Sequence, residues 1–401
     1  MKATSNNPHF NNWSYLLSTR DISIYLGINN ILELSLINKL IRSKLKSLVY
    51  RKLTLNEDNL LKFFTSQECI EVGDNLKDFR NYCRSFIFDS ISNDFPIFSA
   101  VDHFDRLTSL SLIFVKLPLF DLIKILNKLS LLESLTLRLV LANKELDEEQ
   151  LIHKIILPKT LKSLTWVEVN NAWQYVSNER NALTLRQISH HIIYLGEQYC
   201  PNLTQLTYDI EPVVRHENIA NFIKCNPQLK SININLDSLN YSILDTIHKN
   251  NQLTKLAIRF KNNDSHSIPP IEFILSSVKR FEIDGYKSDT IPLIAQLTQQ
   301  MPNIQNLSIP YESYYIPFIN SIILNLPKLT HLELINQSAS EYFVLNNLYL
   351  THIQSLTLKF FNFNTFNLYL FDKFSDLKLV KLCYDQLDID LGLDFSIYQL
   401  L

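Results

Sequence analysis

Apolar residues recur along most of this 401-residue chain in one short pattern. An apolar residue is followed by two other positions, a second apolar residue, one further position and a third apolar residue. Twelve such triples begin 24 to 29 residues apart, except for one step of 42 residues between Leu161 and Leu203. They are Cys83/Phe86/Phe88, Leu107/Leu110/Leu112, Leu132/Leu135/Leu137, Leu161/Leu164/Trp166, Leu203/Leu206/Tyr208, Leu229/Ile232/Ile234, Leu253/Leu256/Ile258, Val278/Phe281/Ile283, Ile304/Leu307/Ile309, Leu329/Leu332/Leu334, Ile353/Leu356/Leu358 and Leu377/Val380/Leu382. The alternation within each triple predicts a short strand whose apolar side chains share one face.

The segments between the triples have helical periodicity, as in residues 120–134 and 185–199. In four repeats a proline stands two residues before the first apolar position, where a helix must stop and a strand begin. A period of 20 to 29 residues with this triple is typical of leucine-rich repeats, and the proline turn resembles that of ribonuclease-inhibitor-type repeats. We therefore expect an α/β fold, a leucine-rich-repeat solenoid (horseshoe) of about twelve irregular strand–helix units.

The same patterns divide the chain into three parts. Residues 1–12 are predicted to be a flexible tail, 13–55 a helical module, and 56–401 the leucine-rich-repeat domain. The long step between triples indicates an insertion near 167–185. In the helical module, apolar residues at helical spacing form one stripe: Leu34, Ile37, Ile41, Leu45 and Leu48.

Residues 13–53, WSYLLSTRDISIYLGINNILELSLINKLIRSKLKSLVYRKL, resemble an F-box, a small all-α module placed ahead of the repeats. The usual Leu-Pro opening is replaced by Asn12-Trp13. The resemblance implies docking onto the Skp-type adaptor of a cullin ubiquitin ligase. The adaptor-binding residues that it implies are Leu16, Leu26, Leu34, Ile37, Ile41 and Leu45. The alternative is a helical cap that shields the open end of the repeat core, which solenoids need in any case.

Strand positions that alternate with the apolar ones are expected to face a partner. They are mostly Ser and Thr in the early repeats and carry mixed charge from Lys255 to Lys359. Because charged and aromatic side chains supply most of the specificity in interfaces, we expect target binding by Arg259, Arg280, Glu282, Asp284, His331 and Glu333. Polar residues at such positions can also serve solubility alone, and the sequence leaves this alternative open.

Composition narrows the possible functions. Residues 1–55 carry eight Lys and Arg against two acidic residues, so the remainder has a net charge of −8 within the total of −2. A negatively charged repeat region argues against a nucleic-acid groove. Five widely spaced cysteines indicate a reducing compartment. The polar first residues lack a secretory signal, and no long apolar run predicts a membrane span. We expect a cytoplasmic or nuclear protein that binds neither membranes nor nucleic acid.

The sequence contains no recognisable catalytic or metal-binding motif. Its five glycines are far apart, which excludes a glycine-rich phosphate loop, and its histidines lack chelating spacing. We therefore expect no enzyme activity, no cofactor and no metal. The sequence predicts non-enzymatic protein recognition, as a substrate receptor of a cullin-type ubiquitin ligase that binds its target on the concave sheet. The alternative is a free-standing repeat scaffold whose N-terminal helices only cap the solenoid.

Overall fold

The structure is a computed structural model. It describes residues 30, 33, 34, 36, 39–56, 77–89, 97–143, 155–171, 195–209, 217–260, 273–285, 290–312, 315–337, 348–361, 371, 374–383 and 396–399. The chain divides into two compact units, both of which lie partly within the predicted repeat domain. Unit one comprises residues 1–161 and 169–193, and unit two comprises 162–168 and 194–401.

In the described part of unit one, the main sheet contains four parallel strands that pair in chain order. They are β1 (Lys52–Asn56), β2 (Ser85–Asp89), β3 (Ser109–Ile113) and β5 (Ser134–Arg138). The strand β1 was not expected, because its residues fall in the segment predicted to be helical. Leu53 and Leu55 of β1 are buried like the apolar residues of the triples. The repeats of unit one therefore begin one strand before the first triple.

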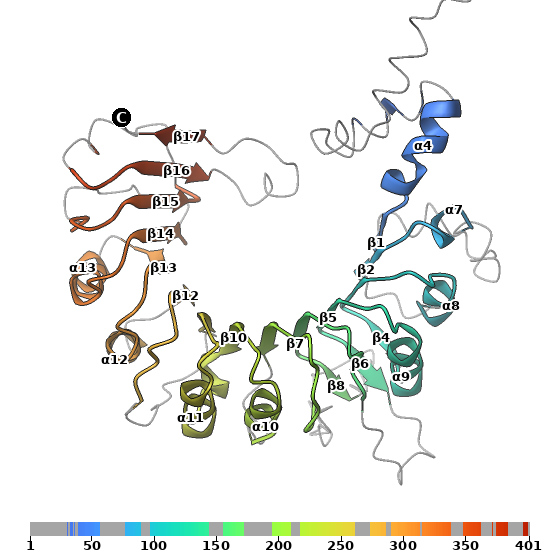
Figure 1. Ribbon diagram of the computed structural model, residues 1–401, viewed down its shortest axis with the longest axis horizontal. Helices are drawn as coiled ribbons and strands as arrows, with labels where there is room; N and C mark the ends of the chain where they lie inside the picture. Colours follow the sequence, from blue (N-terminus) through green and yellow to red (C-terminus); the bar gives the residue numbers. More distant parts are fainter. Residues whose placement is uncertain are drawn as a thin grey trace, which may run out of the picture. The chain divides into compact units, whose positions relative to one another are not determined.

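Helices lie along one side of this sheet (Figure 1). They are α7 (Lys77–Arg80), α8 (Ile97–Asp102) and α9 (Leu119–Lys128), and α4 (Lys39–Val49) precedes β1. In α9, four apolar residues at helical spacing are buried, which confirms the first part of the helix predicted over residues 120–134. The helix ends at Lys128, and residues 129–134 are not helical. A small parallel sheet of β4 (Lys116–Pro118), β6 (Leu141–Asn143) and β8 (Asn170–Asn171) lies beside it. Of the insertion predicted near 167–185, residues 167–171 are described, and they include β8.

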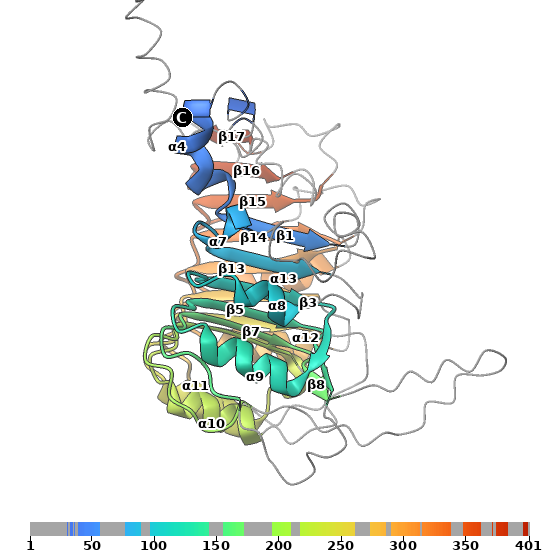
Figure 2. The same cartoon turned by 90° about the vertical axis from the view of Figure 1, so that its right-hand side faces the viewer.

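The residues described in unit two form nine parallel strands and one antiparallel strand. In order of pairing they are β7 (Ser163–Val167), β9 (Gln205–Asp209), β10 (Ser231–Asn235), β11 (Lys255–Arg259), β12 (Arg280–Asp284), β13 (Asn306–Tyr311), β14 (His331–Asn336), β15 (Ser355–Lys359), β16 (Leu379–Cys383) and the antiparallel β17 (Ser396–Gln399). Figure 2 shows the strands from β13 to β17 lying one above another.

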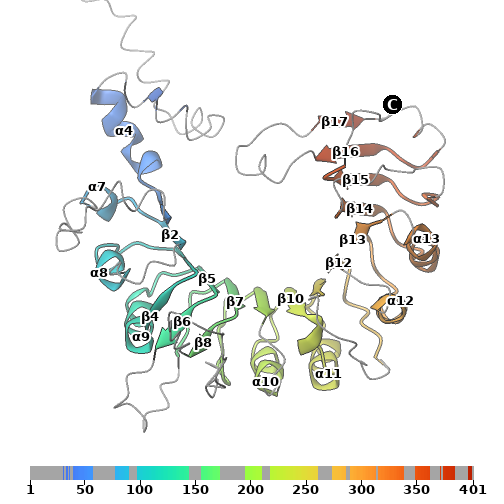
Figure 3. The same cartoon turned by 180° about the vertical axis from the view of Figure 1, so that it is seen from behind.

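The α-helices described in unit two lie on the same side of its strands (Figure 3). They are α10 (Glu217–Cys225), α11 (Tyr241–Lys249), α12 (Ile291–Gln299) and α13 (Ile316–Asn325). The short 3-10 helix η2 (Leu236–Ser238) directly follows β10. Three of the four predicted proline turns are confirmed here, since Pro227, Pro302 and Pro327 follow the ends of α10, α12 and α13. The residues described before Pro201, 195–200, form no helix. Asn240 caps α11 by accepting a hydrogen bond from the backbone N–H of Ile243, 3.0 Å away.

The core of each unit lies between strands and helices. All 36 residues of the twelve predicted triples are buried. Neighbouring strands pair without slipping, so apolar positions stack on apolar positions from repeat to repeat. Both units are therefore leucine-rich-repeat stacks of the α/β class, as the periodicity predicted.

Several strands end in a residue with left-handed backbone conformation. Phe114, Leu139, Glu168 and Phe360 have φ between 49° and 62°, and Gly285 has φ 78°. The backbone N–H of such a residue can bond the next strand, as Phe360 does to the carbonyl of Cys383 at 2.9 Å. In unit one the next residues, Val115 and Val140, are buried, so apolar packing replaces the asparagine ladder of regular repeats.

Candidate functional site

The outward positions of the unit-two strands form three rows, which together we name the strand face. Strand alternation points these side chains away from the helices that cover the other side. The register aligns the first row, which is Ser163, Gln205, Ser231, Lys255, Arg280, Asn306, His331, Ser355 and Leu379. The second row is Thr165, Thr207, Asn233, Ala257, Glu282, Ser308, Glu333, Thr357 and Lys381. The third row includes Asp209, Asn235, Arg259 and Asp284.

Glu282, in the middle of β12, binds two cations at once. Lys255 Nζ lies 2.7 Å from Glu282 Oε2, and Arg280 Nε lies 2.6 Å from Oε1. Each carboxylate oxygen is therefore matched by a different cation. The Glu282 side chain is 23% exposed, whereas that of Arg280 is 49% exposed. The pair consequently presents mainly its positive member to solvent.

Arg259 links three strands at the opposite end of the strand face. Its Nε lies 3.0 Å from Asp284 Oδ2, and its Nη1 lies 3.4 Å from Asp209 Oδ2. Asn235, on the intervening strand, donates a hydrogen bond to Asp209 Oδ1 at 3.1 Å. The Asp209 side chain is only 4% exposed. A buried carboxylate with two such partners is held in one position.

Glu333 forms the third group of contacts. Its Oε1 accepts a hydrogen bond from Ser308 Oγ at 2.8 Å and lies 3.0 Å from Lys359 Nζ. His331 is exposed, and its Nδ1 lies 2.8 Å from the hydroxyl of Thr330. Ser308 pairs in register with both Glu282 and Glu333, so the first and third groups adjoin along the second row.

The six residues predicted to bind the target all belong to this surface, on strands β11, β12 and β14. The structure joins Arg280 to Glu282 and Arg259 to Asp284, while Glu333 and His331 lie on the next strand but one. The predicted set did not include three partners that complete the groups, Asp209, Lys255 and Lys359. Their charge and their outward position in the strands are visible in the sequence. Their contacts with the predicted residues can be recognised only once the pairing of the strands is known.

The residues that the F-box resemblance implies are described only in part. Leu16, Leu26 and Ile37 lie outside the described residues, as does the side chain of Ile41. Leu45, in α4, is 1% exposed. The half-buried Leu34 packs against it, together with Leu48 and Val49. The described part of the predicted stripe is therefore an apolar cluster within the helical segment itself.

The described residues contain no group of three metal-ligating side chains. Burial raises the pKa of the Cys83 and Cys200 thiols to about 11, which disfavours the nucleophilic thiolate at neutral pH. Within the part of the chain that is described, no helix is both long and apolar enough to cross a membrane.

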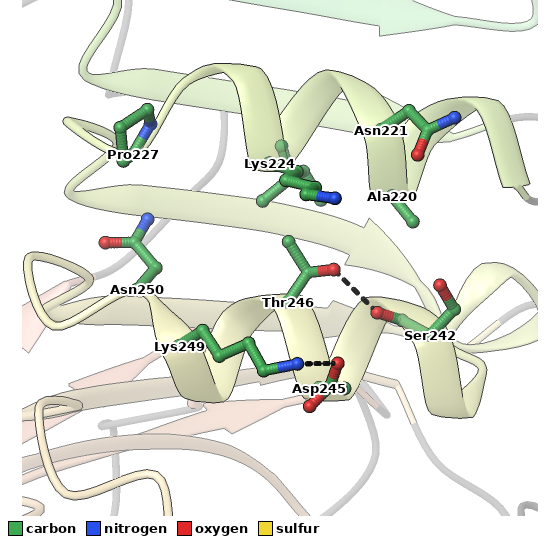
Figure 4. Close-up of a pocket in the computed structure, with 10 residues that line it drawn as sticks. Ala220, Asn221, Lys224, Pro227, Ser242, Asp245, Thr246, Lys249 and Asn250 are labelled. Atoms are coloured by element: carbon green, nitrogen blue, oxygen red, sulfur yellow. Dashed lines mark hydrogen bonds and ion pairs between the residues drawn. The ribbon is translucent and has the colours of Figure 1, made fainter.

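A shallow groove lies between α10 and α11, on the helix side of unit two (Figure 4). Asn221 and Lys224 line one wall, and the polar groups of the other wall bond one another. Lys249 Nζ lies 2.6 Å from Asp245 Oδ2, and the Thr246 hydroxyl donates to the carbonyl of Ser242 at 2.7 Å. The charged groups of the strand face lie on the other side of the sheet.

The chain is similar in structure to solved proteins, of which one is described here. The crystal structure of a TLR13–ssRNA13 complex aligns with 75% of this chain and 46% of that chain, at 15% identity and a TM-score of 0.37. The chain thus spans about half the length of that neighbour. No protein-family model and no curated protein matches the sequence. At this identity and TM-score, the likeness says nothing of function.

Proposed function

We propose that this chain is a non-enzymatic recognition protein that binds a protein partner on the strand face of unit two. The observation that carries the proposal is the array of three charged groups around Glu282, Arg259 and Glu333, each built from side chains of different repeats. Groups held by neighbours lose little side-chain entropy when a partner binds. Specificity then comes from the fixed pattern of charges rather than from any one residue.

Exchange of charges within one group tests this proposal. The double variant Arg280→Glu/Glu282→Arg keeps a salt bridge on the surface but reverses its direction. A partner captured from cells by the full chain, and identified by mass spectrometry, should bind the variant at least about tenfold more weakly. Because these charges are partly exposed, thermal stability should stay within about 1 kcal/mol of the unaltered chain. Partner binding at unchanged affinity would contradict the proposal.

We further propose that the chain acts in the cytoplasm or nucleus as a substrate receptor of a cullin-type ubiquitin ligase. The support is the F-box resemblance of residues 13–53, which implies a Skp-type adaptor as second partner. Purified adaptor should bind the full chain, and Leu34→Asp with Ile37→Asp should abolish that binding. Leu34 packs against Leu45, so circular dichroism must show that the helices survive. Adaptor binding that survives both substitutions would eliminate this role.

The alternative is that the N-terminal helices only cap unit one. The close succession of α4 and β1 favours it, because α4 ends at Val49 and β1 begins at Lys52. Substitution of Leu36, which is 71% exposed, distinguishes a capping role from an adaptor-binding role. Leu36→Asp leaves the Leu45 cluster intact, so a cap should tolerate it. If this helical segment binds an adaptor, Leu36→Asp should weaken that binding.

A further inference from the structure

The residue directly before each unit-two strand adds a further row along the N-terminal edge of the strand face. Its members are Lys162, Thr204, Lys230, Thr254, Lys279, Gln305, Thr330, Gln354 and Lys378. The backbone N–H of each later member donates to the carbonyl of the member before it, at 2.8 to 3.0 Å. These continuous backbone hydrogen bonds hold the nine residues in line, next to the first row of the strand face.

These two rows, which together we name the basic edge, contain no carboxylate at any of their eighteen positions. Six positions carry a permanent positive charge: Lys162, Lys230, Lys255, Lys279, Arg280 and Lys378. The others hold hydroxyl, amide or imidazole groups and, once, leucine. The acidic residues of the strand face lie in its second and third rows, among them Glu282 and Asp284. Charge is thus separated along the strands, even though the repeat region as a whole is acidic.

Three of the lysines are available to a partner. Lys230, Lys279 and Lys378 are exposed, and among the described residues no carboxylate pairs with any of them. Lys255 and Arg280, in contrast, share Glu282. Since neighbouring strands lie about 4.8 Å apart, the row from Lys230 on β10 to Lys378 on β16 is about 29 Å long. About nine residues of an extended chain cover that length.

The composition of the neighbouring rows of the strand face determines which class of polyanion can bind the basic edge. A nucleic acid lying over the sheet would bring its phosphates close to Glu282 and Glu333 in the second row. Single-stranded nucleic acids also need aromatic side chains on which their bases stack, and the three rows of the strand face contain no Phe, Tyr or Trp. A polypeptide can carry its carboxylates along one side only, which suits a surface with one basic border.

We propose that the basic edge binds an acidic protein segment, extended across β10 to β16. This proposal rests on the proposed function, which makes unit two a protein-binding surface, and adds the chemistry of its partner. The carboxylates of the segment pair with Lys230, Lys279 and Lys378. Amide groups of Gln305 and Gln354 lie between these lysines as hydrogen-bond donors. Added salt weakens this binding, because the contacts lie at the surface.

Fluorescence anisotropy with the full chain tests the proposal. The probe is a labelled peptide of about ten residues that alternates Glu and Ser, long enough to span about 30 Å when extended. Charge reversal by Lys230→Glu/Lys279→Glu should raise its Kd at least about tenfold. The matched control is Lys224→Glu/Lys249→Glu on α10 and α11, which changes net charge equally at exposed positions on the helix side. Its Kd should change less than about threefold.

Three results would overturn the proposal. They are absence of peptide binding to the unaltered chain at low salt, equal losses in the edge and control variants, and equally tight binding of a single-stranded oligonucleotide of the same charge. If edge reversal spares a natural partner that the Arg280–Glu282 exchange releases, the inference fails and the proposed function stands. If that exchange has no effect on a partner whose binding edge reversal abolishes, the basic edge stands and the charged groups are not the binding site.

Discussion

Nη1 of Arg259 lies 3.4 Å from Oδ2 of Asp209, although the two residues are 50 positions apart in the sequence. They occupy strands β11 and β9, and Asn235 of the intervening strand β10 donates to the other oxygen of the same carboxylate. Three successive repeats therefore meet at one buried acidic group. An exposed charged residue of unit two is therefore joined, through an ion pair, to a buried carboxylate that also bonds the intervening strand.

Removal of the Asp209 carboxylate should destabilise the protein. Asp209→Ala leaves Arg259 and the buried Asn235 amide without this acceptor, and we expect a loss of about 1–3 kcal/mol in the free energy of unfolding. Asp284 binds the same guanidinium but is 70% exposed, so Asp284→Ala should cost less than about 1 kcal/mol. Urea unfolding of both variants measures the difference. Equal losses would show that burial of Asp209 is not the deciding factor.

Asn226 should matter for stability without being part of any binding surface. It is 0% exposed. Its Oδ1 accepts from the backbone N–H of Cys200 at 2.8 Å, and its Nδ2 donates to the carbonyls of Gln198 and Phe222 at 2.9 and 2.7 Å. Asn226→Ala leaves these buried groups unpaired, so we expect a loss of about 2–4 kcal/mol. Thermal and urea unfolding measure it.

The control for Asn226 is Asn221, in the helix α10 that ends directly before Asn226. Asn221 Nδ2 donates to Glu197 at 3.0 Å in an exposed contact. Asn221→Ala should therefore change the free energy of unfolding by less than about 0.5 kcal/mol. A small effect at Asn226, close to that of Asn221, would contradict the network as a source of stability.

Gly285 should tolerate few substitutions. Its φ is 78°, and an added Cβ would lie 3.4 Å from the carbonyl oxygen of Phe260. Gly285→Ala should lower the free energy of unfolding by about 1–2 kcal/mol, because the left-handed conformation is strained for alanine. Gly285→Asn introduces the same Cβ, but asparagine adopts this conformation more readily. A smaller loss for asparagine than for alanine isolates backbone strain as the cause, whereas equal losses would indicate the steric contact.

The buried thiols should make stability depend on pH in alkaline solution. Burial raises the pKa of Cys83 and of Cys200 from 9.0 to about 11. Between these values the unfolded chain loses thiol protons that the folded chain retains, so the free energy of unfolding falls as pH rises from 9 to 11. Below pH 9 the two thiols contribute no pH dependence. The unfolding free energy of Cys83→Ala/Cys200→Ala should fall less steeply over the same interval, and an unchanged slope would contradict this assignment.

The repeat core could be predicted because its signal is local and periodic. Each triple needs only six consecutive residues, and register repeats the same geometry in the next unit. The strand β1 escaped prediction because Leu53 and Leu55 follow a strongly helical stripe, and the triple that they complete with Tyr50 begins 33 residues before Cys83, outside the regular spacing. Residues 195–199 were expected to be helical, but they form no helix in the structure. In this segment the apolar residues have helical spacing, but that spacing alone does not determine the backbone conformation.

The sequence predicted which residues lie on the strand face, but not which of them form ion pairs with one another. Alternation correctly places Arg280 and Glu282 on the polar side of β12. It cannot show that Lys255 shares Glu282 with Arg280, because that contact depends on which strands are neighbours and on their exact alignment. The basic edge was missed for a related reason. Its lysines, from Lys162 to Lys378, are spread over more than 200 residues of sequence, within a region of net negative charge. Only the backbone ladder brings them into one line.

The ladder before the strands also bears on how such a protein changes during evolution. The long step between Leu161 and Leu203 adds many residues to one repeat, yet Thr204 still donates to Lys162 at 2.9 Å, as in the shorter repeats. A segment of different length, or a whole repeat, can therefore be inserted or exchanged without shifting its neighbours. Partner preference can diverge by replacement of exposed residues such as Lys230 and Lys279, which lie outside the buried core.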